Sequence, residues 1–128
     1  MNILDEHVLK DQRQFLLQWR IPIRHIGYDI GRRGMKDEAI IPLLLQFQRP
    51  TFFTLDFGFY KRRLCHERYC IVYMDINQDQ TAKSIRRFLR HKAFATKTRR
   101  MGKVICLSSA GFSVWQLYAE QEMRFDWT

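Results

Sequence analysis

Three short acid-bearing segments, in a fixed order along the chain, hold the residues best suited to chemistry. They contain Asp5, Asp37 and Asp56. Asp5 and Asp56 each follow a short apolar run typical of a buried strand, and Asp37 opens a helix that lies between them in sequence. Because parallel strands end at one edge of a sheet, we expect Asp5 and Asp56 to emerge together there, with Asp37 beside them. Carboxylates crowded in this way bind a divalent cation.

A divalent cation at this position would suit the hydrolysis of a phosphodiester bond. That reaction needs a water molecule activated near neutral pH, and it needs charge to be neutralised on the phosphate. Divalent ions held by carboxylates supply both. Mg²⁺ favours oxygen ligands and keeps positions for substrate oxygens, and Mn²⁺ would serve similarly. Without the ion the acids would repel one another and at least one would take up a proton, so we predict a site whose local stability depends on metal.

Each acid also has an ordinary structural explanation. Asp5 could cap the helix that begins near His7, Asp37 could be a helix N-terminal carboxylate stabilised by the dipole, and Asp56 could be a turn residue. Taken singly, each of these explanations is at least as good as metal binding. Three independent caps have no reason to fall at one edge of one sheet, however, and the joint arrangement favours a shared site.

The elements that must position these acids are those of an α/β domain. Apolar runs predict strands at about 2–5, 23–26, 52–55, 69–76, 104–107 and 113–117, which alternate with helices over 7–20, from Asp37, and up to about Lys92. Apolar residues three, four and seven positions after Asp37 predict that its side chain points inward, on the helix face that packs on the sheet. Asp79 or Thr81 is expected to cap the last helix. The pattern predicts one three-layer α/β domain over residues 1–128, with a central, mostly parallel sheet.

Positive charge is concentrated in one part of the sequence. The chain has 22 Lys and Arg residues against 13 Asp and Glu, a net charge of +9. Nine of these bases lie between Lys83 and Lys103, where there is no acid. Such a stretch indicates a polyanionic partner, which is nucleic acid or an acidic protein rather than an anionic membrane surface, although a solvated helix face is the simpler alternative. The residues expected to position a nucleic acid backbone are Arg32, Arg33, Lys61, Arg62, Arg86, Arg87, Lys97, Arg99 and Arg100.

Other classes of protein are disfavoured by what the sequence lacks. No apolar run approaches the roughly 20 residues that span a bilayer, and the acidic start of the chain does not resemble a signal peptide. The three cysteines are odd in number and lie in or beside apolar segments, which suits reduced thiols better than disulfides. We therefore expect a cytoplasmic protein without a membrane partner.

Four motifs together resemble a known family. They are Leu4-Asp5-Glu6, Asp37-Glu38-Ala39-Ile40-Ile41, Thr54-Leu55-Asp56-Phe57-Gly58-Phe59, and Gly102-Lys103-Val104 followed by Val114-Trp115. In this order they resemble the small PIN-like nucleases related to VapC-type toxins of toxin–antitoxin modules. The resemblance implies a PIN-like domain and a Mg²⁺- or Mn²⁺-dependent endoribonuclease in which Asp5, Asp37 and Asp56 bind the metal. It also implies a cognate antitoxin protein that often binds DNA, and leaves open a homodimer or a larger toxin–antitoxin assembly.

The chain departs from the family pattern in two places. VapC-type enzymes usually add a glutamate from a helix that this shorter chain lacks, and Glu6 or Glu38 could replace it as a metal ligand. The relatives also often carry a second aspartate where this chain has Gly58, and Asp75 could contribute instead. An alternative reading is therefore a catalytically weak PIN-like module that binds RNA or its antitoxin through charge.

Overall fold

Seven strands form one sheet, in the order β2-β1-β3-β4-β5-β6-β7, in the computed structural model, which describes residues 1–128. The neighbours from β2 to β5 pair in parallel, and β6 and β7 pair antiparallel. The predicted α/β fold with a central, mostly parallel sheet is confirmed. The strands are β1 Asn2–Leu4, β2 Arg24–His25, β3 Thr51–Thr54, β4 Cys70–Asp75, β5 Lys103–Ser108, β6 Gly111–Gln116 and β7 Met123–Phe125.

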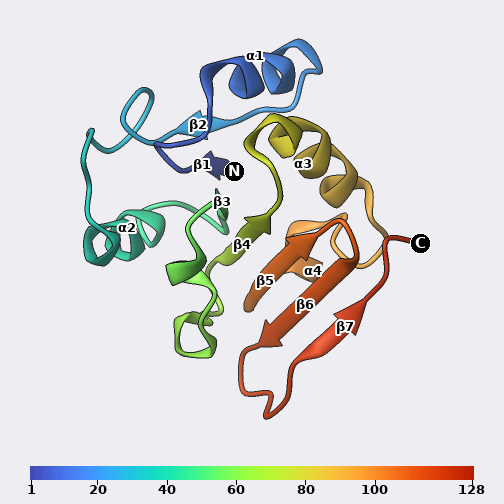
Figure 1. Cartoon of the computed structure of the whole chain (residues 1–128). Helices are drawn as coiled ribbons and strands as arrows, with labels where there is room; N and C mark the ends of the chain where they lie inside the picture. Colours follow the sequence, from blue (N-terminus) through green and yellow to red (C-terminus); the bar gives the residue numbers. More distant parts are fainter.

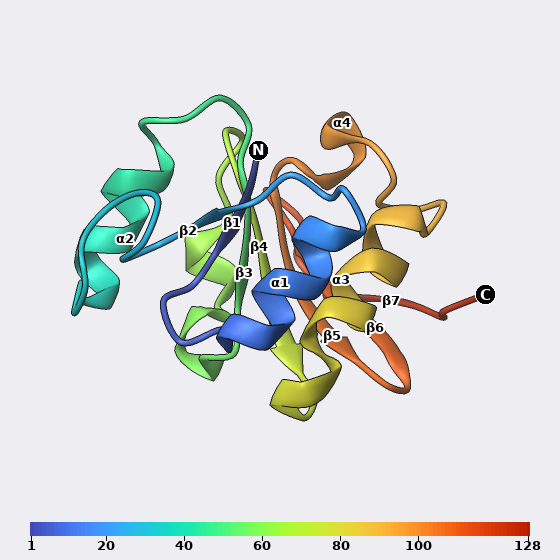
Figure 2. The same cartoon turned by 90° about the horizontal axis from the view of Figure 1, so that it is seen from above.

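Helices cover both faces of this sheet. The α-helices are α1 Lys10–Gln18, α2 Asp37–Leu44, α3 Thr81–Arg90 and α4 Lys97–Arg100, and the short 3₁₀ helices are η1 Phe57–Phe59, η2 Arg62–Leu64 and η3 Gln78–Gln80. Helices α1 and α3 lie together on one side of the sheet, whereas α2 lies on the other (Figures 1 and 2). The result is the three-layer arrangement that the alternation of apolar runs predicts.

Two apolar cores, one on each face of the sheet, hold these layers together. Side chains of successive strand residues point to opposite faces. On β3, Phe53 belongs to the core beneath α1 and α3, whereas Phe52 belongs to the core beneath α2. On β4, Val72 and Ile71 divide in the same way. Covering on both faces explains why these central strands are almost continuously apolar rather than alternating.

The N-terminus of α3 is capped from outside its own segment. Neither Asp79 nor Thr81 caps it, because the N-cap residue is Gln80 and the Thr81 hydroxyl donates to the carbonyl of Gln78 at 2.8 Å. The prediction of a local cap was wrong. Instead the backbone N–H of Ala82 donates to Oε1 of the buried side chain of Gln12, on α1, at 2.9 Å. The helix pairing of α1 with α3 therefore supplies the hydrogen bond that the local sequence does not.

The two ends of the parallel strands define two edges of the sheet. The register aligns Asn2 with Thr51 and Thr51 with Cys70 at the amino-terminal edge, and Thr54 with Tyr73 toward the carboxyl-terminal edge. Helix α4 and strand β7 were not anticipated from sequence; each is only three or four residues long and therefore has little periodicity. None of the helices has the length and apolar character required to cross a membrane.

Candidate functional site

Asp5 directly follows β1 and is rigidly held. Its backbone N–H continues the strand ladder by donating to the carbonyl of Phe53 at 2.9 Å, and the residue is only 7% exposed. Its Oδ1 accepts from the backbone N–H of Glu6 at 2.8 Å, and its Oδ2 accepts from the Thr54 hydroxyl at 2.6 Å. Burial raises the pKa of Asp5, and although these hydrogen bonds oppose that shift, the charge of Asp56 adds to it.

Thr54, the last residue of β3, connects Asp5 to Asp56. Its hydroxyl oxygen accepts from the backbone N–H of Asp56 at 3.0 Å while its proton goes to Asp5. The Asp56 carboxylate is exposed, and its Oδ1 accepts from the backbone N–H of Gly58 at 2.8 Å. Sequence reasoning missed Thr54. The only signal for it was a hydroxyl residue two positions before a strand-end aspartate.

Asp37 opens α2 and is exposed, whereas Ile40 and Leu44 are buried. The prediction that its side chain is shielded from water was wrong. Helical periodicity gives a direction around the helix axis but not how far along that axis the sheet extends, and Asp37 is the first residue of the helix. Its pKa is nevertheless raised, first by partial burial and then by the charges of Asp56 and Asp5. The structure therefore brings the three acids into one electrostatic neighbourhood, at the carboxyl-terminal edge of the sheet.

The donor chemistry of these acids fits a hard divalent ion. All the available ligand atoms are carboxylate oxygens, which Mg²⁺ and Mn²⁺ prefer. No three His, Cys, Asp or Glu side chains converge closely enough to surround one ion. Asp37 and Asp56 are both exposed, whereas Asp5 is buried and fixed by its hydrogen bonds.

A cavity of about 280 Å³ adjoins this acidic edge. Asp37 and Glu38 line it together with two bases, Lys61 and Arg63. Arg62, which sequence reasoning favoured over Arg63, instead lies over the ring of Trp115 at 5.5 Å. The full lining is Asp37, Glu38, Ile41, Gly58, Phe59, Lys61, Arg63 and Leu64. Carboxylates and bases on one cavity wall are the groups that could hold a cation and a phosphate side by side.

Glu6, the fourth candidate ligand, is already engaged. Its Oε1 accepts from the backbone N–H of Gly34 at 2.8 Å. This bond brings the loop that contains Arg32 and Arg33 toward the acidic edge, and the guanidinium of Arg33 lies 5.1 Å from the centre of the Tyr28 ring. Glu6 therefore positions a basic loop, whereas Glu38 lines the cavity.

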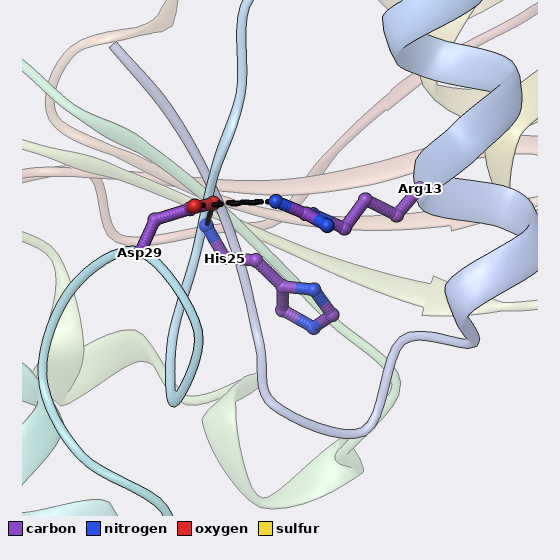
Figure 3. A network of polar contacts seen from close by, with 3 residues as sticks. All are labelled: Arg13, His25 and Asp29. Atoms are coloured by element: carbon purple, nitrogen blue, oxygen red, sulfur yellow. Dashed lines mark hydrogen bonds and ion pairs between the residues drawn. The ribbon is translucent and has the colours of Figure 1, made fainter.

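A network of polar contacts fastens the same loop to α1 (Figure 3). The Asp29 carboxylate accepts from Nη2 of Arg13, on α1, at 3.1 Å and from the backbone N–H of His25 at 2.9 Å. The His25 ring is fully buried, and its Nε2 lies 3.1 Å from the carbonyl oxygen of Glu6. Burial is the main cause of the lowered pKa of His25. A neutral imidazole that donates from Nε2 thus supports the backbone immediately after Asp5.

The remaining basic candidates lie away from the acids. On α3, the guanidinium of Arg86 lies 3.8 Å from the centre of the Trp19 ring. The guanidinium of Arg87 lies 4.1 Å from the centre of the Trp127 ring. Lys97, Arg99 and Arg100 form most of α4, which leads directly into β5 and so lies at the amino-terminal edge. The structure does not bring these five bases to the acidic edge, and their role in binding nucleic acid stays a prediction.

Comparisons with protein-family models, with curated proteins and with solved structures each found no match to this chain.

Proposed function

We propose that this protein is a Mg²⁺- or Mn²⁺-dependent endoribonuclease that acts in the cytoplasm, and that it is the toxin component of a type II toxin–antitoxin system. The observation that carries the nuclease proposal is that Thr54 connects Asp5 to Asp56 at one edge of the sheet, while Asp37 lines the cavity that adjoins this edge. The toxin role and a cognate DNA-binding antitoxin rest on the resemblance of the four motifs to VapC-type toxins.

Different residues of the chain would bind the metal ion and the phosphate. A bound divalent ion would activate water and neutralise charge on the phosphate. Asp5, with both oxygens fixed by hydrogen bonds, would set the position of that ion, and the exposed Asp37 and Asp56 would complete its ligands. Lys61 and Arg63, on the same cavity wall as Asp37, would hold the phosphate.

An exposed aromatic ring beside Asp56 supports RNA with unpaired bases as the substrate. Phe57 is 66% exposed, and its ring meets that of Tyr73 edge-on at 5.4 Å. An aromatic face held in this way can stack on a base from a single strand or a loop. Phe59, which follows closely in sequence, is only 2% exposed and is therefore part of the core rather than a stacking platform.

The test is incubation of the purified protein with a mixed RNA pool, with Mg²⁺, with Mn²⁺ and with EDTA, beside Asp5→Asn. We expect cleavage that needs the metal and is lost in the variant, because its neutral amide cannot replace a charged ligand. Asp79→Asn is the matched control, since Asp79 is an exposed acid of η3. Equal cleavage by wild type and Asp5→Asn would contradict the proposal.

The alternative is a module that binds RNA or an antitoxin without cutting. The net charge of +9, with only one ion pair in the chain, favours polyanion binding whether or not metal is present. Titration with Mn²⁺ separates the two functions. RNA that is bound equally with and without Mn²⁺, and never cleaved, identifies the binding module.

A further inference from the structure

A second cavity, of about 380 Å³, lies at the amino-terminal edge of the sheet, opposite the acids. It is formed where the start of β1, the segment that enters β2, and α4 meet. No acidic residue lines it, and three of its lining residues are basic: Arg24, Lys97 and Arg100. The full lining is Met1, Asn2, Pro22, Ile23, Arg24, Lys97 and Arg100.

Arg100 is the least ordinary residue in this cavity. It is only 6% exposed, although arginine is almost never so buried unless it is paired with an acid. Its Nε donates to Thr51 Oγ1 at 2.9 Å and its Nη1 donates to the carbonyl of Phe94 at 2.8 Å. The remaining nitrogen, Nη2, has no hydrogen-bond partner in the protein and is not sealed from solvent. The only ion pair in the chain, Arg13 with Asp29, is elsewhere.

The two neutral partners of Arg100 account for the orientation of its guanidinium but not for its charge. A buried charge without a counter-ion is costly. The two bonds hold the planar group in one position, so the donors of Nη2 are fixed in advance for a further acceptor. An anion in the cavity would supply both the missing charge and the missing acceptor.

The surrounding groups are positive as well. Lys97 and Arg24 are exposed and have no ion-pair partner. Arg49, two residues before the start of β3, donates to the Oγ1 of Thr98, the neighbour of Lys97 in sequence, at 3.1 Å. The pKa of the Met1 amino group is lowered to about 6, first by burial and then by Lys97, Arg100 and Arg49. The positive charges of these three bases therefore all reach the same amino group.

We propose that this cavity binds a phosphoryl group, of the kind found in inorganic phosphate or at the end of a nucleic acid strand. A fixed guanidinium fork with an ammonium and a second guanidinium beside it matches several oxygens of a tetrahedral dianion better than a planar, singly charged carboxylate. The site shares no residue with the acidic edge. It therefore stands independently of the proposed nuclease.

Titration calorimetry in EDTA tests the proposal with defined probes. The probes are inorganic phosphate and a DNA trinucleotide with a 5′-phosphate or a 5′-hydroxyl. We expect one saturable site per chain for a phosphorylated probe. Preference for the phosphorylated trinucleotide over both other probes identifies a strand end as the ligand, whereas equal binding of inorganic phosphate identifies the free anion. Absence of saturable binding for every probe overturns the proposal.

Paired variants locate the binding. Arg24→Ala with Lys97→Ala should weaken binding at least about tenfold, because two charge-assisted contacts are lost. The matched control is Lys83→Ala with Arg90→Ala, which removes the same charge from exposed positions of α3 and should change affinity by less than about twofold. Equal weakening of binding in both double variants would show that only the total charge of the protein matters, and it would overturn the proposed site.

Arg100→Lys provides a further check on the buried fork. It keeps the charge but loses the planar donor set. With the fold intact by thermal melting, we expect weaker binding of the phosphorylated probe than in wild type, and unchanged affinity would contradict the proposed role of Arg100. Because EDTA prevents metal-dependent cleavage, these titrations test the phosphoryl site independently of the proposed nuclease activity.

Discussion

The Thr54 hydroxyl contacts two of the three acids of the candidate metal site, Asp5 and Asp56. It donates to Asp5 at 2.6 Å and accepts from the backbone of Asp56 at 3.0 Å. Thr54 itself is fully buried at the end of β3. Its role is therefore to position the acids rather than to contact a substrate.

Replacing Thr54 by valine should affect both stability and cleavage. Thr54→Val keeps the shape but leaves Asp5 and the Asp56 N–H without their partner, at a cost of about 1–3 kcal/mol in the free energy of unfolding. Thr54→Ser should restore cleavage. Thr51→Val, at the other end of the same strand, is the matched control, since it also removes a buried hydroxyl that accepts a hydrogen bond. Urea unfolding and the RNA assay measure the two effects, and equal loss of cleavage in both valine variants would contradict the positioning role.

The raised pKa values of Asp5 and Asp37 make stability depend on pH in a defined direction. Their folded pKa values lie above the ordinary value of 3.8. The folded chain thus binds more protons than the unfolded chain between these values, and the contribution of these groups to stability falls as pH rises from about 4 through the folded pKa. Above it, the full cost of burying and crowding the charges is present.

Asp5→Asn should therefore be at least as stable as wild type at pH 7 in EDTA, and any advantage should shrink toward about pH 4. Saturating Mg²⁺ should raise the melting temperature of wild type more than that of the variant, because the ion relieves repulsion that the amide does not cause. Thermal melting across this pH range, with and without Mg²⁺, measures both. A pH-independent difference between the two proteins would contradict the assignment of the shift to Asp5.

At the scale of elements, α1 supplies a hydrogen bond to the N-terminus of α3 through the side chain of Gln12. The Gln12 side chain is buried, 3% exposed, and its acceptor meets the Ala82 N–H in the first turn of α3. Sequence patterns near Asp79 and Thr81 favoured a local cap. The tertiary contact prevails because the first N–H groups of a helix need only an acceptor within reach, wherever it lies in sequence.

Gln12→Leu should lower the free energy of unfolding by about 1–3 kcal/mol, because it leaves a buried N–H without a partner. Gln14→Leu is the matched control, since Gln14 is exposed on the same helix and should change stability little. Urea unfolding compares the two, and hydrogen exchange of the Ala82 amide should increase only in the first. Equal stability of both variants would show that Gln12 contributes no net stability.

At the scale of the whole molecule, charge is separated along the strand direction. The acids Asp5, Asp37 and Asp56 gather at the carboxyl-terminal edge, while the bases of α4 lie at the amino-terminal edge beside Thr51. Part of the basic stretch from Lys83 to Lys103 is therefore carried away from the acids, because α3 and α4 form the return connection between two parallel strands. The bases near the acids come from other segments, at Lys61 and Arg63 and in the loop that contains Arg32 and Arg33.

RNA binding should therefore depend more on the local bases than on total charge. With cleavage blocked by Asp5→Asn, we expect affinity for single-stranded RNA to fall at least about tenfold between roughly 50 and 200 mM salt. Adding Lys61→Ala and Arg63→Ala should weaken RNA affinity further and reduce its dependence on salt. Adding Lys83→Ala and Arg90→Ala instead should have a smaller effect on both. Filter binding over a salt series measures these effects, and equal losses from both pairs would contradict a defined RNA path.

The alternation of apolar runs by itself determined the α/β class, the order of most elements and the placement of Asp5 and Asp56 at strand ends. This was possible because strand and helix periods are local properties of the chain, and because parallel strands place their carboxyl ends at one edge. The tertiary structure alone decided that Asp37 is exposed, that Thr54 connects Asp5 to Asp56, that Gln12 caps α3, and that Arg100 is buried without an acid. Each of these depends on contacts between segments far apart in sequence, and local periodicity contains no information about which side chains meet across such distances.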